Sequence, residues 1–379
     1  MSLRLTDEQH SLVSTVREFA ARECGSRDKR LELTNGGTTH TNLDIARKLA
    51  ELGFLGLSIP EEYGGSGGGL FDACLFLEEL TYNQIPLGSY GVTLIVSHMY
   101  LKSATEDLKK EILGSVLAGT PSAVAMSEPG SGSDVASLRC KAEKSDGGYR
   151  INGQKTWISN AHYCDHILLV ARTSDTGQKH QGISMISVPA STPGVEIRPI
   201  ATMGMEVNDV FFTDCEVGED RVVGVEGQGW AQLISGLNTE RVIIGALAIG
   251  QARRAFDDTL AYVKTREQFG KPVGSFQALS HRLADLATEI ECTRLLVHDV
   301  AQRVDENPDM LMPREASMVK LKSTELAKAA ALEGMQMMGG MGYAVEGGME
   351  EQLRATVVGT VVGGTSEVQR DIIAKTLGL

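Results

Sequence analysis

His166-Ile-Leu-Leu-Val-Ala-Arg172 and Gly182-Ile-Ser-Met-Ile-Ser-Val188 are two apolar runs separated by a turn signal at Asp175-Thr-Gly177. Shorter runs of the same kind stand at Tyr149-Arg-Ile-Asn-Gly153 and Val210-Phe-Phe212. Short runs rich in β-branched and aromatic residues, bounded by Gly, Asn or Asp, are typical of strands. Because no long helical pattern separates them, this part of the chain is predicted to form a small antiparallel barrel or sandwich rather than βαβ units.

Helical periodicity precedes this β region. Thr6 and Gln9 have the spacing of a capping box, which predicts that a helix begins there. A glycine-rich connection over residues 59–69 follows, and further helices are expected near 70–81 and 94–117.

The last third of the chain is predicted to be helical again. One long helix is expected over 240–265, and its first turns are apolar on all sides, which indicates burial on every side. An amphipathic stripe from Leu279 to Val297 predicts a second helix, and Pro313 opens a third that runs to about Met338. The apolar faces of these helices are broad for one chain, so a bundle that also oligomerises is expected.

These patterns predict an α+β fold with three domains along the 379 residues. An N-terminal helical domain is expected over 1–122, a middle antiparallel β-barrel or sandwich domain over 123–227, and a C-terminal four-helix-bundle domain over 228–379.

The composition is that of a globular chain, with 42% apolar and 22% charged residues. A net charge of −13 disfavours nucleic acid or an anionic membrane as a partner, because such proteins show a basic surface. The most apolar run, Val242 to Ala248, is too short for a membrane span, which needs about 20 residues. The start of the chain resembles no signal or transit peptide, and the six cysteines form no Cys-x-x-Cys pair. We therefore expect a cytoplasmic protein with free thiols.

His162, Cys164 and His166 alternate, so on a strand they would share one face, with Asp165 nearby. Such a set can bind a metal ion, but no fourth ligand stands at a recognisable spacing. We interpret the set as a strand edge after a turn and predict no metal.

Glycine-rich strings raise the question of a phosphate site. Gly130-Ser-Gly132 and Gly227-Gln-Gly229 lack the strand, helix and third glycine of a dinucleotide fingerprint, and no Walker A motif occurs. The loop Met126-Ser-Glu-Pro-Gly-Ser-Gly-Ser-Asp134 is more specific, because its backbone N–H groups and hydroxyls can face a flavin or a pyrophosphate. The alternative is an ordinary hairpin turn.

Five motifs together resemble the acyl-CoA dehydrogenase family, whose order they follow across nearly the whole chain. They are Ser127-Glu-Pro-Gly-Ser-Gly-Ser-Asp134, Asn152-Gly-Gln-Lys-Thr-Trp-Ile-Ser-Asn160, Arg266-Glu-Gln-Phe-Gly-Lys-Pro272 with Phe276-Gln277, Gln336-Met-Met-Gly-Gly-Met-Gly-Tyr343 and Gly364-Thr-Ser-Glu-Val-Gln-Arg370. The resemblance implies a helical, β, helical fold, bound FAD, and a homotetramer built as a dimer of dimers.

The resemblance also implies roles at single positions. Residues that would border the flavin are Met126, Ser127, Ser133, Trp157, Ile158 and Ser159; a neighbouring subunit's FAD would be contacted by Arg266, Gln277, Gln336, Gly339 and Gly340; and a last FAD segment would include Thr365 and Glu367. Bland alternatives exist for three of them: a surface salt bridge from Arg266 to Glu267 or Asp258, core packing of Trp157, and a helix C-cap at Gly339 and Gly340.

The predicted catalytic base departs from the commonest pattern of the family. Many members carry a glutamate just before the terminal Gly-Thr-Ser, but Gly363 stands there in this chain. Isovaleryl-CoA and long-chain types place the glutamate at the start of the first bundle helix instead, where Asn238-Thr-Glu-Arg241 supplies Glu240. Burial at the mouth of an apolar helix would raise the pKa of Glu240, although Arg241 could offset this. The alternative is a glutamate favoured only by the helix dipole.

The reaction implied is α,β-dehydrogenation of an acyl-CoA thioester to the trans-2-enoyl-CoA, with Glu240 taking the α-proton and the flavin the β-hydride. A backbone N–H at Gly363 would stabilise the thioester oxygen. Substrate contacts are expected at Ser133, Asn238, Arg241, Gly363 and Gly364.

Electrons would pass to an electron-transfer flavoprotein. Two alternatives remain open: a catalytically silent partner subunit in a hetero-oligomer, and an oxidase or dehydrogenase of acyl groups bound to a carrier protein.

Overall fold

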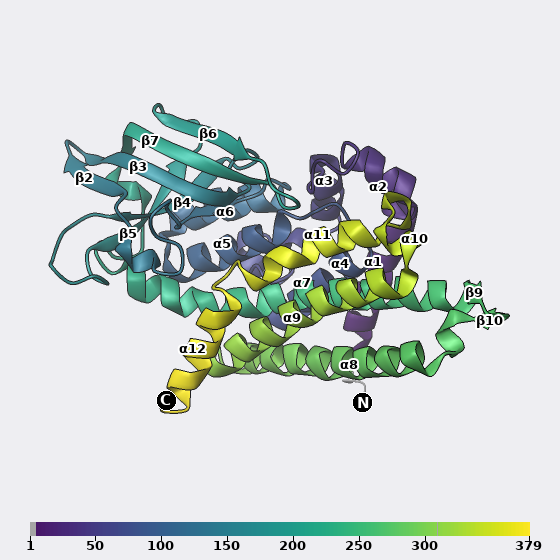
Figure 1. Cartoon of the computed structure of the whole chain (residues 1–379). Coiled ribbons are helices and arrows are strands. Elements are labelled where there is room, and N and C mark those ends of the chain that lie inside the picture. The colour runs from purple at the N-terminus through teal and green to yellow at the C-terminus, as the bar shows by residue number, and fades with distance from the viewer. Residues whose placement is uncertain (1–4, 309) are drawn as a thin grey trace. The chain divides into compact units, whose positions relative to one another are not determined.

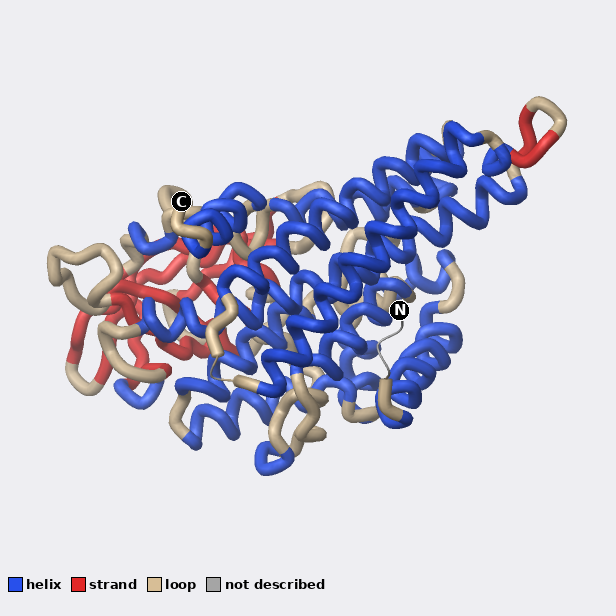
Figure 2. The backbone as a smooth tube through the Cα atoms, turned by 90° about the horizontal axis from the view of Figure 1, so that it is seen from below, coloured by secondary structure: helices blue, strands red, loops and turns tan. Residues whose placement is uncertain are grey.

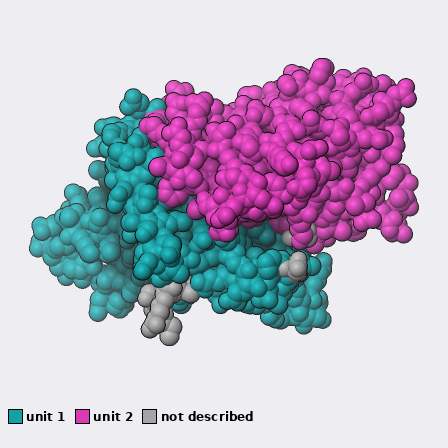
Figure 3. Space-filling view, turned by 180° about the vertical axis from the view of Figure 1, so that it is seen from behind, with its two compact units in different colours: residues 1–32, 69–85, 238–379 teal, residues 33–68, 86–237 magenta. Residues whose placement is uncertain are grey.

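The computed structural model describes residues 5–308 and 310–379, apart from the side chain of residue 235. Helices come first along the chain, then a β-sheet, then helices again, which confirms the predicted α+β class (Figure 1). Two compact units are present (Figure 3). Unit 1 comprises Met1–Glu32, Gly69–Ile85 and Asn238–Leu379, and unit 2 comprises Leu33–Gly68 and Pro86–Leu237. The segment predicted as one helical domain, 1–122, thus contributes to both units, while the three domain boundaries stay a prediction.

The helices before the sheet begin as the sequence predicted. The Thr6 side chain accepts a hydrogen bond from the backbone N–H of Gln9, and the Gln9 side chain accepts one from the backbone N–H of Thr6, which is a complete capping box. The region expected as one helical stretch over 94–117 is two helices, because Ala104 is extended and Thr105 caps a new start. The bounds are α1 (Asp7–Cys24), α2 (Arg27–Leu33), α3 (Leu43–Glu51), α4 (Leu70–Tyr82), α5 (Tyr90–Ser103) and α6 (Glu106–Leu117).

The middle of the chain forms one eight-stranded sheet in unit 2. Its order is β6-β7-β3-β2-β4-β5-β8, with β1 paired to β4, and no pairing among the described residues joins the two ends into a barrel. Most pairs are antiparallel as predicted, but β1 and β2 each pair with β4 in parallel. The bounds are β1 (Ala123–Ala125), β2 (Lys141–Ser145), β3 (Gly148–Ser159), β4 (His166–Arg172), β5 (Ile183–Pro189), β6 (Val195–Ile200), β7 (Val207–Gly218) and β8 (Val222–Val223).

Strand β4 lies at the centre of this sheet, and its residues Ile167–Ala171 are buried on both faces. This burial explains why its sequence is a continuous apolar run rather than an alternating one. Helix α5 packs beside β1. Helix α6 packs against α5, and both are seen near the sheet in Figure 1. The longest strands of unit 2, β3 and β7, pair with each other next to the edge strand β6.

Unit 1 is built around three long helices that run side by side in Figures 1 and 2. Helix α9 spans the predicted range, whereas α7 begins before the predicted residue 240, because Gly229 and Gly236 obscured the helical pattern in its first turns. A short hairpin projects beyond the ends of α7 and α8 (Figure 2). The bounds are α7 (Gly229–Thr265), β9 (Glu267–Gln268), β10 (Lys271–Pro272), α8 (Gln277–Glu306), α9 (Pro313–Met338), α10 (Gly340–Tyr343), α11 (Met349–Val357) and α12 (Ser366–Thr376).

A buried charge network ties α4 to α7 and α8 inside unit 1. The Glu78 carboxylate pairs with Arg253, with Arg294 at 2.6 Å and with His298 at 2.8 Å. Burial alone would raise the pKa of Glu78, but the His298 hydrogen bond and the two guanidinium charges lower it to about 2. Because each charge is compensated, the network holds the helices together without an orphaned carboxylate.

Helix α7 is long and apolar enough that its length and composition alone would permit a membrane span. More than half of its most apolar stretch is buried inside the protein, however, as expected of the core helix of a globular bundle. Val242, Ile243 and Ile249 are fully buried, which confirms the burial predicted for these turns.

Candidate active site

The loop over residues 126–134 is locked onto strand β3 by a buried ion pair in unit 2. Glu128 accepts hydrogen bonds from the Lys155 ammonium at 2.8 Å and from the backbone N–H groups of Arg139 at 2.7 Å and Cys140 at 2.8 Å. Burial lowers the pKa of Lys155, and the Glu128 carboxylate opposes that shift. The pair thus costs desolvation but leaves none of these donors unpaired.

Two further hydrogen bonds join the loop to the strand. The Lys155 ammonium donates to the carbonyl of Met126 at 2.8 Å, and the backbone N–H of Thr156 donates to the carbonyl of Ser127 at 2.9 Å. Met126 and Ser127 are half-buried, and Ser133, near the end of the same loop, is exposed. The structure therefore brings the first predicted flavin segment next to the second. Within the loop, the backbone N–H groups of Glu128 and Ser131 donate to each other's carbonyls at 3.0 Å, which is the hairpin turn of the alternative interpretation.

Trp157 is the most unusual residue of strand β3. Its φ is 62°, in the left-handed region, and 61% of the residue is exposed. The register of β3 against β7 shifts between Lys155 and Ile158, so a bulge turns Trp157 outward while Ile158 is buried and Ser159 half-buried. Core packing, the alternative for Trp157, is wrong. Backbone strain of this kind persists where the surrounding structure enforces it and is common at functional sites.

In unit 1, Glu240 lies on α7 beside Gly363, the position where the resemblance implies a base in many family members. A Cβ placed on Gly363 would lie 3.4 Å from Oε1 of Glu240 and would overlap Cδ1 of Ile244. Desolvation raises the pKa of the Glu240 carboxyl, and the charges of Arg241 and Lys320 oppose this shift. This arrangement suits a general base, because a desolvated carboxylate is more basic than one in water.

Arg241 and Asn238 surround the start of this site on the same helix. Arg241 is almost fully buried and donates from its NH1 group to the Asn238 side-chain oxygen at 2.9 Å. Its Nε is buried without a hydrogen-bond partner in the described part of the chain. A buried guanidinium nitrogen left unpaired is costly, so this donor is available to a bound polar group.

The Gly363–Gly364 turn is held by two side chains that our sequence analysis missed. Lys320 of α9 donates to the carbonyl of Gly364 at 2.8 Å, and Gln369 of α12 donates to the carbonyls of Gly363 and Gly364 at 3.0 Å each. Both side chains are fully buried. A lysine inside the apolar stripe of a predicted helix is a signal that could have identified Lys320. Among the described residues, no hydrogen-bond partner is present for the Gly363 backbone N–H.

Arg266 stands at the start of the β9–β10 hairpin and is exposed. The salt bridge proposed as its alternative is not formed within the described residues, since Asp258 pairs with Arg254 at 2.7 Å instead. An exposed guanidinium without an acidic partner suits contact with a phosphate.

The other residues predicted for the adenine half of FAD are spread over unit 1. Gln277 is exposed at the first turn of α8, and Gln336 is exposed in the last turn of α9. Gly339 is the C-cap of α9 with a φ of 61°, which agrees with the alternative of a helix C-cap. A Cβ at Gly339 or at Gly340 would meet open space. Thr365 caps α12, where its side chain accepts a hydrogen bond from the N–H of Val368, and Glu367 lies exposed in the first turn. The structure does not bring these residues together within one chain.

These features fit FAD on three observations. The exposed indole ring of Trp157 is available to a flavin ring. The exposed guanidinium of Arg266 is available to a pyrophosphate. The turn at Gly339 and Gly340 has open space around it, so a ligand can approach its backbone closely. Each residue stands in a segment whose backbone the fold already holds, so the donor set is present before any ligand binds.

The alternating set near the start of β4 has structural partners in place of a metal. His162 contacts Asn208 at 2.9 Å and Glu206 at 3.4 Å, and His166 pairs with Glu111 at 2.9 Å. Burial raises the pKa of Cys164 to about 12, so its thiol stays protonated. Within the described residues, no group of three or more His, Cys, Asp or Glu side chains is placed to hold a metal ion.

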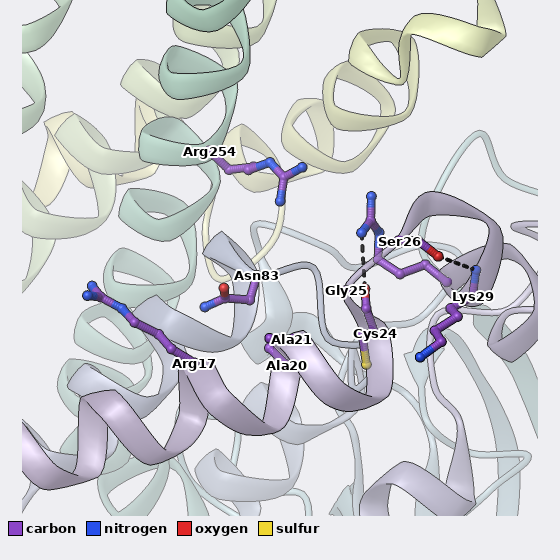
Figure 4. A pocket seen from close by; sticks show the side chains of 10 residues that line it. Arg17, Ala20, Ala21, Cys24, Gly25, Ser26, Lys29, Asn83 and Arg254 are labelled. Atoms are coloured by element: carbon purple, nitrogen blue, oxygen red, sulfur yellow. Dashed lines mark hydrogen bonds between the residues drawn. The ribbon is translucent and has the colours of Figure 1, made fainter.

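A separate pocket of about 450 Å³ lies between α1, α2, α4 and α7 in unit 1 (Figure 4). Arg17, Lys29, Arg30 and Arg254 line it, but Glu79 pairs with Arg17 and Asp258 with Arg254. The pocket contains none of the predicted site residues. Lys29 and Arg30 donate to the carbonyls of Arg22 at 3.0 Å and Cys24 at 3.1 Å, so all four cations take part in the helix packing.

Comparison with family models matches the chain over almost its whole length. Residues 6–120 match the acyl-CoA dehydrogenase N-terminal domain, residues 123–215 the middle domain and residues 227–378 the C-terminal domain. A probable acyl-CoA dehydrogenase, YngJ of Bacillus subtilis, is 35% identical over 100% of both chains. A mitochondrial isovaleryl-CoA dehydrogenase of Solanum tuberosum is 31% identical over 99% of this chain and 92% of its own.

Solved structures show the same likeness. An acyl-CoA dehydrogenase from Geobacillus kaustophilus superposes with a TM-score of 0.92 at 32% identity over 100% of both chains. The prolyl acyl carrier protein oxidase AnaB superposes with a TM-score of 0.91 at 28% identity over 99% of this chain and 100% of its own.

Proposed function

We propose that this chain, which belongs to the acyl-CoA dehydrogenase family of FAD-dependent oxidoreductases, oxidises an acyl-CoA thioester to the trans-2-enoyl-CoA with Glu240 as its base. FAD-dependent dehydrogenation of acyl-CoA is the activity that the family supports in general. The substrate, the position of the base and an electron-transfer flavoprotein as acceptor are the proposed parts.

The observation that carries this proposal is the position of Glu240 relative to Gly363. The carboxylate reaches the place from which a side chain at 363 would otherwise approach, because Oε1 lies 3.4 Å from the absent Cβ. The chain has therefore moved its base without losing it, and this argues against a catalytically silent partner subunit.

Glu240 accepts the α-proton in this mechanism. Its pKa is raised by desolvation, which makes the carboxylate more basic, yet Arg241 and Lys320 oppose the shift and favour its ionised form. The backbone N–H of Gly363 donates to the thioester oxygen, where negative charge develops as the α-proton leaves. FAD, when bound, supplies the acceptor for the β-hydride.

The residues proposed to hold FAD lie in two sets. The flavin half would be held by Met126, Ser127, Ser133, Trp157, Ile158 and Ser159. The rest of FAD would be held by Arg266, Gln277, Gln336, Gly339, Gly340, Thr365 and Glu367. Because the second set is dispersed in one chain and all of it except Thr365 is exposed, we propose that part of it serves a neighbouring subunit in a homotetramer. A cytoplasmic location completes the proposal, supported by the scattered free thiols.

Two measurements on the purified protein test the proposal. Mass spectrometry of the released cofactor should identify FAD, and FMN would contradict the assignment. Anaerobic mixing with a panel of straight and branched acyl-CoA thioesters should bleach the flavin absorbance with at least one of them.

A second candidate is oxidation of an acyl group on a carrier protein, which the likeness to AnaB favours. The same anaerobic mixing experiment distinguishes this candidate from acyl-CoA oxidation when carrier-bound acyl thioesters are added to the panel. Bleaching by the carrier-bound form alone, with rapid reoxidation by oxygen, would replace the first proposal with this one.

A further inference from the structure

Lys320 is a fully buried ammonium in the middle of helix α9. It donates to the carbonyl of Gly364 at 2.8 Å, one residue after the glycine whose N–H is proposed to contact the substrate oxygen. A buried lysine is costly unless its charge is compensated, so its presence here calls for a function.

The turn that Lys320 holds would otherwise be loose. Gly363 and Gly364 have φ values of 63° and 81°, and two consecutive glycines in this region lose much conformational freedom when they are ordered. Gln369 donates to the carbonyls of both Gly363 and Gly364, and Lys320 donates to that of Gly364, so the peptide planes that follow each glycine are fixed. The Gly363 N–H belongs to the plane just before these two, and holding them limits the conformations through which that N–H can turn.

Lys320 also acts on Glu240 through charge. Four charged groups face the ammonium: Glu240 and Arg241 on α7, Glu325 on α9 and Glu367 on α12. Desolvation lowers the pKa of Lys320 to about 8, and Glu240 is the largest opposing influence. In return the ammonium opposes the desolvation that raises the pKa of Glu240.

We propose that Lys320 is a positioning residue with two effects: it holds the Gly363–Gly364 turn that faces the substrate carbonyl, and its buried positive charge acts on the carboxylate of Glu240. This inference rests on the proposed function. It assigns no contact between Lys320 and the substrate.

The chain offers variants that separate the two effects. Lys320→Met removes both the donor and the charge while keeping a similar side-chain length. Gln369→Met removes a donor to the same carbonyls without changing any charge. Lys322→Met removes an exposed ammonium on the same helix that pairs with Glu289, and serves as the control.

Rates of anaerobic flavin reduction should be measured against pH for all three variants. Both Lys320→Met and Gln369→Met should lower the maximal rate, by about 10-fold or more, because the oxygen-stabilising N–H is less well oriented. The rate should fall on the acid side of the pH profile, where Glu240 becomes protonated, and we call this fall the acid limb. Only Lys320→Met should also move the acid limb to higher pH, since the loss of a positive charge makes Glu240 easier to protonate. Lys322→Met should match the parent in both respects.

A second readout does not need turnover. Isotope-edited infrared titration of the protein without substrate should follow the Glu240 carboxyl band, with Glu240→Gln identifying it, and should show the same upward shift in Lys320→Met. An unshifted acid limb and an unshifted band in a folded Lys320→Met protein would overturn the inference. If Lys320→Met does not fold, equal rates of flavin reduction in Gln369→Met and the parent would overturn the positioning role.

The two proposals can fail separately. If the parent reduces no flavin with any thioester, the proposed function fails, while the infrared titration still decides whether Lys320 controls Glu240.

Discussion

Oε1 of Glu240 lies 3.4 Å from the point where Gly363 would carry a Cβ. The two residues are far apart in sequence, on α7 and on the turn before α12, yet they lie close together in unit 1. The proposed function depends on this relationship, because it places the carboxylate of Glu240 where a side chain at position 363 would otherwise lie.

Replacing Glu240 by Gln should abolish most of the reductive half-reaction. Glutamine keeps the shape but cannot accept the α-proton, so we expect a loss of roughly 100-fold or more in the rate of flavin reduction. Stopped-flow mixing without oxygen measures this directly. Glu346→Gln, near the C-terminal motif but outside the site, should retain the parent rate. Equal rates in Glu240→Gln and the parent would place the base elsewhere.

The rate of flavin reduction should decline as the pH falls, and this decline should occur at a pH above the pKa of an ordinary glutamate. Desolvation raises the pKa of Glu240, and only the ionised form accepts a proton, so activity is present above the raised pKa and is lost as the pH falls through it. The acid limb should therefore lie above the usual value of about 4.3. A limb at or below that value would mean that the Glu240 carboxyl is not desolvated in the working enzyme.

Gly363→Ala should destabilise the protein through two separable effects. The new Cβ would overlap Ile244, and an L-residue is strained at a φ of 63°, so we expect a loss of about 1–3 kcal/mol in the free energy of unfolding. Gly270→Ala has a similar φ of 76° but open space around the new Cβ, and should show the backbone part alone. Chemical denaturation gives both values. Adding Ile244→Ala to Gly363→Ala should restore part of the loss.

Trp157→Gly should separate flavin binding from folding. Glycine accepts a φ of 62° without strain, and the exposed indole makes little contribution to the core, so the stability of the flavin-free protein should stay within about 1 kcal/mol of the parent. The amount of flavin retained during gel filtration should fall, because the variant lacks the indole ring that is proposed to pack against the flavin. A large loss of stability in the flavin-free variant would show instead that Trp157 is structural.

Lys155→Met should be strongly destabilising. It leaves the buried Glu128 carboxylate without its cation, and breaking a buried pair in this way typically costs about 3–5 kcal/mol. The double variant Glu128→Gln/Lys155→Met removes both charges and should recover a substantial part of that loss in a denaturation experiment. No recovery in the double variant would show that the carboxylate itself, through Arg139 and Cys140, is what the loop requires.

The sequence by itself determined the local elements and their order. Pro313 and Gly339 mark the limits of α9, Thr6 and Gln9 cap α1, and the run from His166 to Arg172 is the whole of β4. These features follow from backbone geometry, capping and side-chain periodicity, which act over a few residues. The motifs likewise identified the family, because their spacing along the chain is a property of the sequence.

Only the tertiary structure decided which residues share a site and what surrounds them. The proximity of Glu240 to Gly363 depends on how α7 and the last turn pack, and no local pattern encodes it. Trp157 is exposed because a bulge turns it outward, and Lys320 is buried because α9 carries it into the core of unit 1. Within the residues that the structure describes, the edge strands β6 and β8 do not pair, so the sheet is open. Desolvation and charge proximity, which set the pKa of Glu240, depend on distances in space, so they exist only once the chain has folded.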